Sequence, residues 1–169
     1  LRLKDAPFAD GGFPTPSGKC EFFSQRLADQ GLDGLPDHVP NYEVPGSSAQ
    51  YPLAMISPPA RNFLNSSFVN VTSLRDIEGE PILEMSATDA QARGLSSGAV
   101  VRVFNPRGDY RCKLKVSPRA RPGVVNGLGI WWRKLGMDGK NVNELTSQKL
   151  TDIGRAPTFY DCLVQVEAA

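Results

Sequence analysis

Residues that bind metals or act as nucleophiles are scarce in this sequence. The one histidine, His38, lies in a proline-rich stretch, and the three cysteines, Cys20, Cys112 and Cys162, are widely spaced without a C-x-x-C pair. Protein-bound zinc needs three or four such ligands close together. We therefore expect no metal ligand and no catalytic residue in this chain. The cysteines are expected to be buried free thiols, which suit the cytoplasm, with the periplasm as the alternative.

Net charge and long apolar runs are also lacking. The formal net charge is only +1, so there is no overall field that would attract nucleic acid. No apolar run approaches the roughly 20 residues that a transmembrane helix needs. We expect neither nucleic acid nor a membrane span. No signal peptide is evident and Leu1 is not methionine, so we expect a piece of a longer protein.

Glycine and proline, by contrast, are abundant, with 16 and 14 residues, and this favours turns and short strands over long helices. Within residues 1–50 we expect a short strand over Lys19–Phe23 and a short helix over Gln25–Gln30, capped by Ser24. Residues 31–50 have the composition of a linker. We therefore predict an N-terminal arm from a preceding domain at 1–50 and one compact domain at 51–169.

The compact domain has the pattern of short strands. Apolar runs at 52–57 and 81–85 predict buried strands, and apolar residues alternate with polar ones at 101–116 around an Asn105–Gly108 turn. Two further strands are expected from residues 124 and 163. Ser86 or Thr88 is expected to cap a short helix at 89–93. The resulting class is mainly β with minor helix, most simply a β-barrel.

Basic residues are concentrated in the hairpin region. Between residues 100 and 122 they could attract phosphate groups, or they could form a solvated strand face that resists edge pairing. The alternation places them opposite the buried face, which favours the second interpretation. They are Arg102, Arg107, Arg111, Lys113, Lys115, Arg119 and Arg121, against one acidic residue, Asp109.

The loops carry neutral polar and aromatic residues. Loop 57–70 has three asparagines and an adjacent serine pair, which suit either a diphosphate cradle or ordinary turn capping. Trp131–Trp132 could stack on a ligand or belong to the core. Asn143, Thr146 and Ser147 could bind the edge of a pterin or purine. Residues Tyr160–Asp161 are interpreted as the entry to the last strand. Together the loops predict a binding domain that serves chemistry done elsewhere.

Several ordered motifs resemble one family. They resemble the last domain of molybdopterin oxidoreductases of the dimethyl-sulfoxide-reductase type, and they cover nearly the whole chain. There are two departures: Ala99 replaces a frequent aspartate, and Phe63–Ser66 stands where many members have His-Ser or His-Thr. The matching segments are T-P-S-G-K-C-E-F at 15–22, I-S-P at 56–58 with F-L-N-S-S-F at 63–68, the A-T-D-A block at 87–98, V-F-N-P-R-G at 103–108 and R-P-G-V-V at 121–125.

This resemblance implies a double-psi six-stranded β-barrel of the aspartate-decarboxylase-like type. It also implies a C-terminal domain that caps bis-molybdopterin guanine dinucleotide, with molybdenum or tungsten held by the cofactor and an iron–sulfur cluster in the parent chain. The partners would be the remaining domains of the parent and electron-transfer subunits, and the isolated fragment would be inactive. The cofactor-binding residues it implies are Ser57, Pro58, Asn62, Phe63, Leu64, Asn65, Ser66, Trp131, Trp132, Asn143 and Thr146.

Two other functions use the same type of barrel. A small self-processing enzyme would need an internal cleavage site, for which Gly46–Ser47 has the right residue order. A protein-interaction module would bind a partner peptide at the same loops. The cofactor hypothesis requires loops 57–68, 129–133 and 141–147 to lie at one end of the barrel, with Asn65 and Asn143 close together.

Overall fold

A computed structural model describes residues 6–65 and 67–169 of the chain. By their internal contacts the residues form two compact units, which divide between Val39 and Pro40. Residues 40–50 group with the barrel: Tyr42 hydrogen bonds to Leu150 and Asp161, and Glu43 to Leu163. The domain boundary at residue 50 stays a prediction about the organisation of the whole protein.

The first unit contains little regular structure. Helix α1 spans Gln25–Ala28, and the Ser24 side chain caps it as predicted. The strand predicted over Lys19–Phe23 is wrong, because this segment folds into turns: the Thr15 hydroxyl donates to the Lys19 carbonyl at 2.6 Å. Cys20 is exposed, which corrects the expectation that all three thiols are buried.

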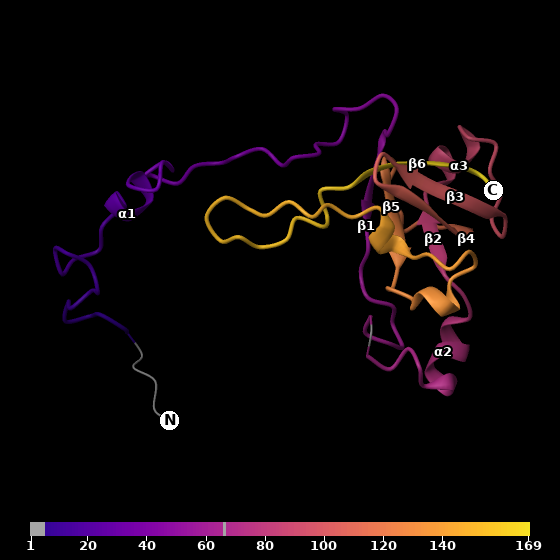
Figure 1. Ribbon diagram of the computed structural model, residues 1–169, viewed down its shortest axis with the longest axis horizontal. Coiled ribbons are helices and arrows are strands. Elements are labelled where there is room, and N and C mark those ends of the chain that lie inside the picture. The colour runs from indigo at the N-terminus through magenta and orange to yellow at the C-terminus, as the bar shows by residue number, and fades with distance from the viewer. Residues whose placement is uncertain (1–5, 66) are drawn as a thin grey trace. The chain divides into compact units, whose positions relative to one another are not determined.

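The second unit is a closed barrel with strand order β1-β5-β2-β4-β3-β6 (Figure 1). This confirms the predicted six-stranded, mainly β fold. The parallel pairs are β1–β5 and β2–β4, and all other neighbours are antiparallel. The strands are β1 Leu53–Ile56, β2 Ile82–Met85, β3 Val100–Asn105, β4 Gly108–Val116, β5 Val124–Leu128 and β6 Leu163–Ala168.

Alternation along the strands builds the core. In β4 the side chains of Tyr110, Cys112 and Leu114 are buried, as the period of two predicted. Three of the basic residues on the other face are paired with acids: Arg102 Nε lies 2.8 Å from Asp109, Lys113 Nζ lies 3.4 Å from Glu80, and Lys115 Nζ lies 3.0 Å from Glu84. These three charges therefore belong to a solvated, ion-paired surface, whereas Arg107 pairs with Glu43.

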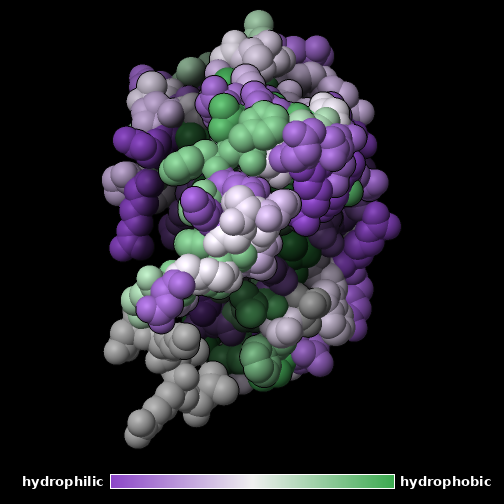
Figure 2. Space-filling view, turned by 90° about the vertical axis from the view of Figure 1, so that its left-hand side faces the viewer, coloured by the Kyte–Doolittle hydropathy of each residue, from purple (hydrophilic) through white to green (hydrophobic). Residues whose placement is uncertain are grey.

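Short helices complete the unit. They are α2 Thr72–Glu78, α3 Ala87–Gln91, and the 3-10 helices η1 Arg133–Leu135 and η2 Val142–Glu144. None of the helices formed by the described residues combines the length and apolar character that crossing a membrane requires. On the face shown in Figure 2, hydrophobic residues lie exposed among hydrophilic ones.

Strand directions place the loops of interest at one end of the barrel. Strands β1 and β5 are parallel, so both finish at the same rim. Strand β6 is antiparallel to β1, and β2 is antiparallel to β5, so both begin at that rim. Residues 57–81, 105–108 and 129–162 therefore emerge together, at what we call the loop end. This confirms the expectation that loops 57–68, 129–133 and 141–147 share one end.

The opposite end, which we call the α3 end, is closed by a polar network. Ser86 caps α3, since its Oγ accepts the Asp89 N–H at 3.1 Å and donates to Asp89 Oδ2 at 2.7 Å. The same Oδ2 accepts the Gly123 N–H at 2.8 Å. Asp89 thus joins the β2–α3 junction to the β4–β5 turn.

Candidate functional site

A concavity of about 600 Å³ opens at the loop end. Segments that lie far apart in the sequence form its wall, and four of the predicted binding residues meet there: Ser57, Asn65, Asn143 and Thr146. The remaining lining residues are Pro59, Ile130, Ser147, Gln148, Pro157, Phe159 and Tyr160.

The lining is neutral. Among these described lining residues the polar groups are amides and hydroxyls, and there is no acid, base or cation. Phe159 and Tyr160 add an aromatic pair, with ring centroids 4.6 Å apart. Such a wall can hold a flat polar ligand by hydrogen bonds and stacking. It offers no carboxylate, imidazole or amine for general acid–base catalysis.

Asn65 has the least satisfied side chain of the site. Its backbone is left-handed, with φ of 48°, a region that asparagine tolerates better than most residues. Its Oδ1 atom is buried and has no hydrogen-bond partner among the described residues. A buried carbonyl oxygen without a donor is costly, so an incoming N–H group would be favourable here. Ser66, the next predicted residue, lies outside the described residues.

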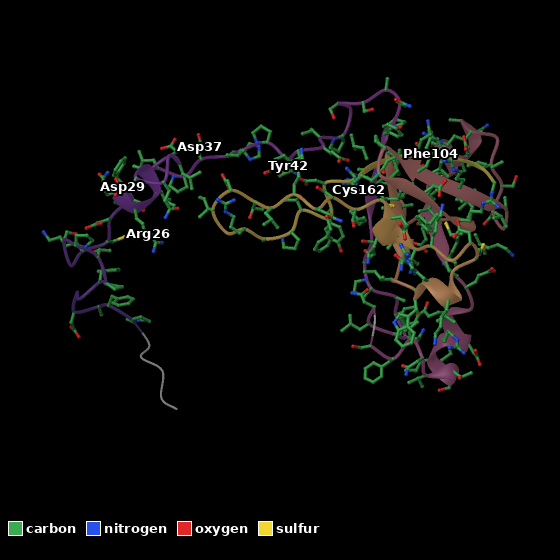
Figure 3. All side chains as sticks on the ribbon, viewed as in Figure 1. Arg26, Asp29, Asp37, Tyr42, Phe104 and Cys162 are labelled. Atoms are coloured by element: carbon green, nitrogen blue, oxygen red, sulfur yellow. The ribbon has the colours of Figure 1, made fainter. Side chains whose placement is uncertain are left out.

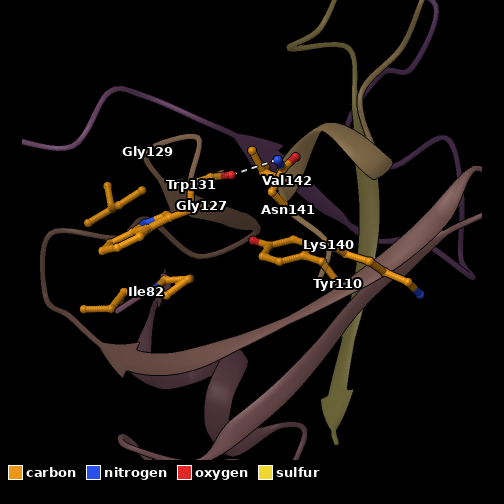
Figure 4. Close-up of a pocket in the computed structure, with 10 residues that line it drawn as sticks. Ile82, Tyr110, Gly127, Gly129, Trp131, Lys140, Asn141 and Val142 are labelled. Atoms are coloured by element: carbon orange, nitrogen blue, oxygen red, sulfur yellow. Dashed lines mark hydrogen bonds between the residues drawn. The ribbon is translucent and has the colours of Figure 1, made fainter. Parts of the chain in front are cut away.

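The segment from Asn141 to Ser147 is ordered by its own asparagine. The Asn141 side chain accepts the Asn143 N–H at 3.0 Å and donates to the Trp131 carbonyl at 2.8 Å (Figure 4). The Thr146 hydroxyl donates to the Asn143 carbonyl at 3.3 Å. The Asn143 side chain itself remains exposed. Asn141 was not predicted, although an asparagine just before a short helix indicates an N-cap.

The predicted aromatic contacts are placed elsewhere. Phe63 and Trp131 pack edge to face, with centroids 5.0 Å apart, in a small core with Val69. Trp131 is only 4% exposed, and neither residue lines the concavity. Trp132 is half-buried, with Lys134 Nζ 4.8 Å from its ring centroid. Trp131 therefore belongs to this small core, and Trp132 packs against it.

The other predicted residues of loop 57–68 also have internal roles. Asn62 donates its backbone N–H and its Nδ2 to Glu78 Oε1, at 2.6 and 2.8 Å. The Pro58 carbonyl accepts the Gly129 N–H at 2.9 Å. Leu64 is exposed and pairs with Ser67 through two backbone hydrogen bonds. None of these three lines the concavity, so whether they contact a ligand stays a prediction.

A second cavity lies beneath Trp131 (Figure 4). Its volume of about 10 Å³ has room for about one water molecule. The Tyr110 hydroxyl points into this region and is buried without a partner among the described residues. Burial raises the pKa of Tyr110 well above its ordinary value, so the phenol stays protonated. This cavity is too small for an organic ligand.

Sequence analysis missed part of the lining. Phe159 and Tyr160 line the concavity, although Tyr160 was predicted only to enter the last strand. That interpretation suits Asp161, whose Oδ2 accepts the Tyr42 N–H at 3.2 Å. Ser147 is buried at the concavity and accepts the Lys149 N–H at 3.2 Å. Within the described residues, no group of three or more His, Cys, Asp or Glu side chains is arranged to hold a metal ion.

Comparisons with known proteins identify the family of the chain. Residues 53–163 match a family model described as the molydopterin dinucleotide binding domain. The chain is 34% identical over 164 residues to the probable oxidoreductase YoaE of Bacillus subtilis, covering 97% of this chain and 23% of that protein. It is 35% identical over 169 residues to the dimethyl sulfoxide reductase DmsA of Escherichia coli, covering 90% and 21% respectively.

A solved structure supports the fold. Acetylene hydratase from Pelobacter acetylenicus is similar with a TM-score of 0.78 and 22% identity, over 92% of this chain and 24% of that chain. At this identity the likeness is evidence for the fold alone. The chain spans about a quarter or less of the length of all three proteins.

Proposed function

The chain belongs to the molydopterin dinucleotide binding domain family, and from this premise we propose that its loop-end concavity holds one side of a molybdopterin guanine dinucleotide. The convergence of the Asn65 and Asn143 loops on one concavity carries this proposal. Asn65, Asn143, Thr146, Ser57 and Ser147 are the residues proposed to make polar contacts.

The donor set fits such a ligand. Pterin and guanine are flat rings with N–H donors and carbonyl acceptors at their edges, and amides and hydroxyls match both kinds of group. The buried Asn65 Oδ1 gives the most specific indication, because it needs a donor that the described residues do not supply. Phe159 and Tyr160 offer an aromatic wall for a ring.

The proposed work of this chain is binding and orientation. When bound, the molybdenum or tungsten cofactor supplies the oxygen-atom or electron transfer. The loop-end residues fix the position of the dinucleotide and exclude water from one side of it. Because the lining has no carboxylate, imidazole or amine, proton transfers are assigned to groups outside the concavity.

For the whole protein we propose an oxidoreductase of the dimethyl-sulfoxide-reductase type, in which this chain is the C-terminal domain. The rest of the cofactor pocket, the metal ligand and any iron–sulfur cluster would come from the remaining domains, and electron-transfer subunits would be the partners. A cytoplasmic location is part of the proposal and is supported by the free thiols of Cys112 and Cys162.

Cofactor retention in the full-length enzyme tests the proposal. Asn65→Gly removes Oδ1 while allowing the left-handed backbone, and Asn143→Ala removes an exposed amide. Both should lower the pterin content per protein, measured by fluorescence of the released and oxidised pterin. Asn70→Ala, an exposed asparagine of the same loop, is the control. Normal pterin content in both site variants would refute the proposed site.

A further inference from the structure

Three donors converge on one backbone carbonyl beside the concavity. The Leu145 oxygen accepts hydrogen bonds from Arg107 Nε at 2.6 Å, Asn105 Nδ2 at 3.0 Å and Cys162 Sγ at 3.2 Å. A carbonyl has two lone pairs and most accept one or two bonds. Leu145 lies between Asn143 and Thr146, so these donors fix the segment that forms one wall of the concavity.

The guanidinium of Arg107 is itself held by Glu43, from the segment before β1. Both carboxylate oxygens of Glu43 pair with Arg107, and Oε2 also accepts the Leu163 N–H at 2.6 Å. Burial alone would raise the pKa of Glu43, but the hydrogen bonds from Arg107 and Leu163 outweigh it and lower that pKa. Glu43 is therefore ionised at neutral pH, and the pair is charge-assisted.

Asn105 extends the same arrangement to the start of β6. Its Nδ2 also donates to the Leu163 carbonyl at 3.2 Å, and its Oδ1 accepts the Arg107 N–H at 2.9 Å. The side chain is 6% exposed. One asparagine thus braces the hairpin turn and joins it to both ends of the stretch from 145 to 163.

Gly108 gives an independent sign that the turn and the site segment approach closely. A Cβ atom at this position would lie 3.1 Å from the Glu144 carbonyl oxygen. Only a residue without a side chain allows the turn to pack this tightly without displacing Glu144. The N-P-R-G sequence therefore does more than make a hairpin turn.

Tyr42 holds the outer part of the same stretch. Its hydroxyl donates to the Leu150 carbonyl at 2.8 Å, and Lys149 Nζ lies 4.6 Å from its ring centroid. Figure 3 labels Tyr42 beside this loop and Cys162 near the base of the loop. Residues 42 and 43 therefore contact the stretch at Leu150 and again at its C-terminal end, at Asp161 and Leu163.

We propose that Glu43, Asn105 and Arg107, the anchor cluster, are positioning residues for cofactor binding that hold Asn143 and Thr146 at the concavity. The three residues do not line the concavity, so they act through the Leu145 carbonyl and the Leu163 backbone. This inference rests on the proposed function, because the value of a fixed segment lies in what it binds.

Two variants of the full-length, cofactor-loaded enzyme test the anchor cluster. Arg107→Lys keeps the charge but loses the planar fork that serves Leu145 and Glu43 together. Glu43→Gln removes the charge while leaving the bond from Arg107 to Leu145 available. The matched control is Arg102→Gln on the same hairpin, which breaks ion pairs with Asp109 of β4 and Glu167 of β6, away from the site segment.

Two measurements are made on each variant. Loss of pterin after dilution should be roughly tenfold faster in both anchor variants, the effect expected for one lost charge-assisted hydrogen bond. Hydrogen exchange of the amides at 143–148 should also accelerate, while exchange in β2 and β4 stays unchanged. The control should match the wild type in both measurements, and unchanged exchange in the strands shows that the barrel is folded.

The outcomes are separable. If Arg107→Lys and Glu43→Gln retain pterin as the control does, the positioning role is refuted, whether or not exchange at 143–148 has changed. If both lose pterin quickly but exchange at 143–148 is unchanged, the route through Leu145 is wrong. If Asn65→Gly and Asn143→Ala also keep normal pterin, the proposed function fails first and this inference fails with it.

Discussion

At the α3 end of the barrel the polar side chains find partners within the chain, whereas at the loop end several do not. Asp89 accepts from both Ser86 and Gly123. Asn65 Oδ1, at the other end, is buried without a partner among the described residues, and Asn143 points its amide outward. The network around Asp89 is satisfied by folding alone, while the loop end presents groups that the proposed ligand would satisfy.

The loop end is well ordered behind its surface, because the anchor cluster and Asn141 satisfy the backbone of residues 141–145. Among the described residues, Asn65 Oδ1 at the concavity and the Tyr110 hydroxyl at the small cavity are the buried side-chain atoms that lack partners. A pre-ordered wall lowers the entropic cost of binding, because the segment is not ordered at the moment when the ligand arrives.

The largest effect on stability is expected at the α3 end. Asp89→Ala leaves the Gly123 N–H and the Ser86 hydroxyl without their acceptor, which should cost about 2 kcal/mol in the free energy of unfolding. Denaturant unfolding of this chain measures it. Asp152→Ala, which removes an exposed acceptor of the Ile153 N–H, is the control and should cost far less. Equal losses would remove the distinction between the two ends.

A smaller effect is expected where the turn meets the site segment. Gly108→Ala places a methyl group 3.1 Å from the Glu144 carbonyl, and displacing that segment should cost about 1 kcal/mol. Gly154→Ala, whose new methyl group would have only Thr151 Oγ1 within reach at 3.7 Å, should be nearly neutral. If both substitutions are neutral, the loop end is less firmly ordered than the anchor cluster indicates.

Acid should weaken the loop end through Glu43. Burial raises the pKa of Glu43, but the hydrogen bonds from Arg107 and Leu163 lower it by more. The pKa of Glu43 in the folded chain therefore lies below its ordinary value of 4.5. Its contribution is therefore complete above pH 4.5 and is lost as the pH falls through the folded pKa. Arg107 and Lys149 are the cations that face Glu43. The hydrogen bond to Glu43 raises the pKa of Arg107, and burial raises the pKa of Cys162 to about 11, so neither group titrates in this window.

The difference in unfolding free energy between the wild type and Glu43→Gln should accordingly be constant near neutral pH and shrink on acidification. Denaturant unfolding at a series of pH values measures this difference. A difference that grows as the pH falls would contradict the sign of the shift.

The smallest effect is expected at Asn65. Asn65→Gly removes an oxygen that has no partner and allows φ of 48°, so the free energy of unfolding without cofactor should change by less than about 0.5 kcal/mol. Asn65→Ala is the matched comparison, and it should cost more because its Cβ is strained in the left-handed region. A large loss in Asn65→Gly would mean that Asn65 serves the fold, as Asp89 does.

Sequence patterns were sufficient to predict the strands of the barrel and the face of each strand that is buried. Tyr110, Cys112 and Leu114 alternate with charged residues, and a period of two determines both strand and buried face. Ser86 was predictable as one of two caps, because a short polar side chain before a helix satisfies its first amides. The strand predicted at Lys19–Phe23 did not form, because local turn bonds replace ladder pairing there.

The site was predictable only in part. Asn62 carries the same amide as Asn65, yet Glu78, 16 residues later, holds its donors. Trp131 was open to two interpretations, and only packing against Phe63 decides for burial. Gln148 and Tyr160 lie in a stretch without periodicity, so no local pattern indicates that their side chains face the concavity. Such assignments depend on contacts between distant segments.

The attachment of residues 42 and 43 has a practical consequence for protein engineering. A barrel transplanted between related enzymes with a cut at residue 51 would carry Arg107 and the Leu163 amide but leave behind the carboxylate that joins them. The chimaera would keep its six strands and lose the outer brace of one binding wall. The transferable module therefore begins at Pro40, ahead of the first strand.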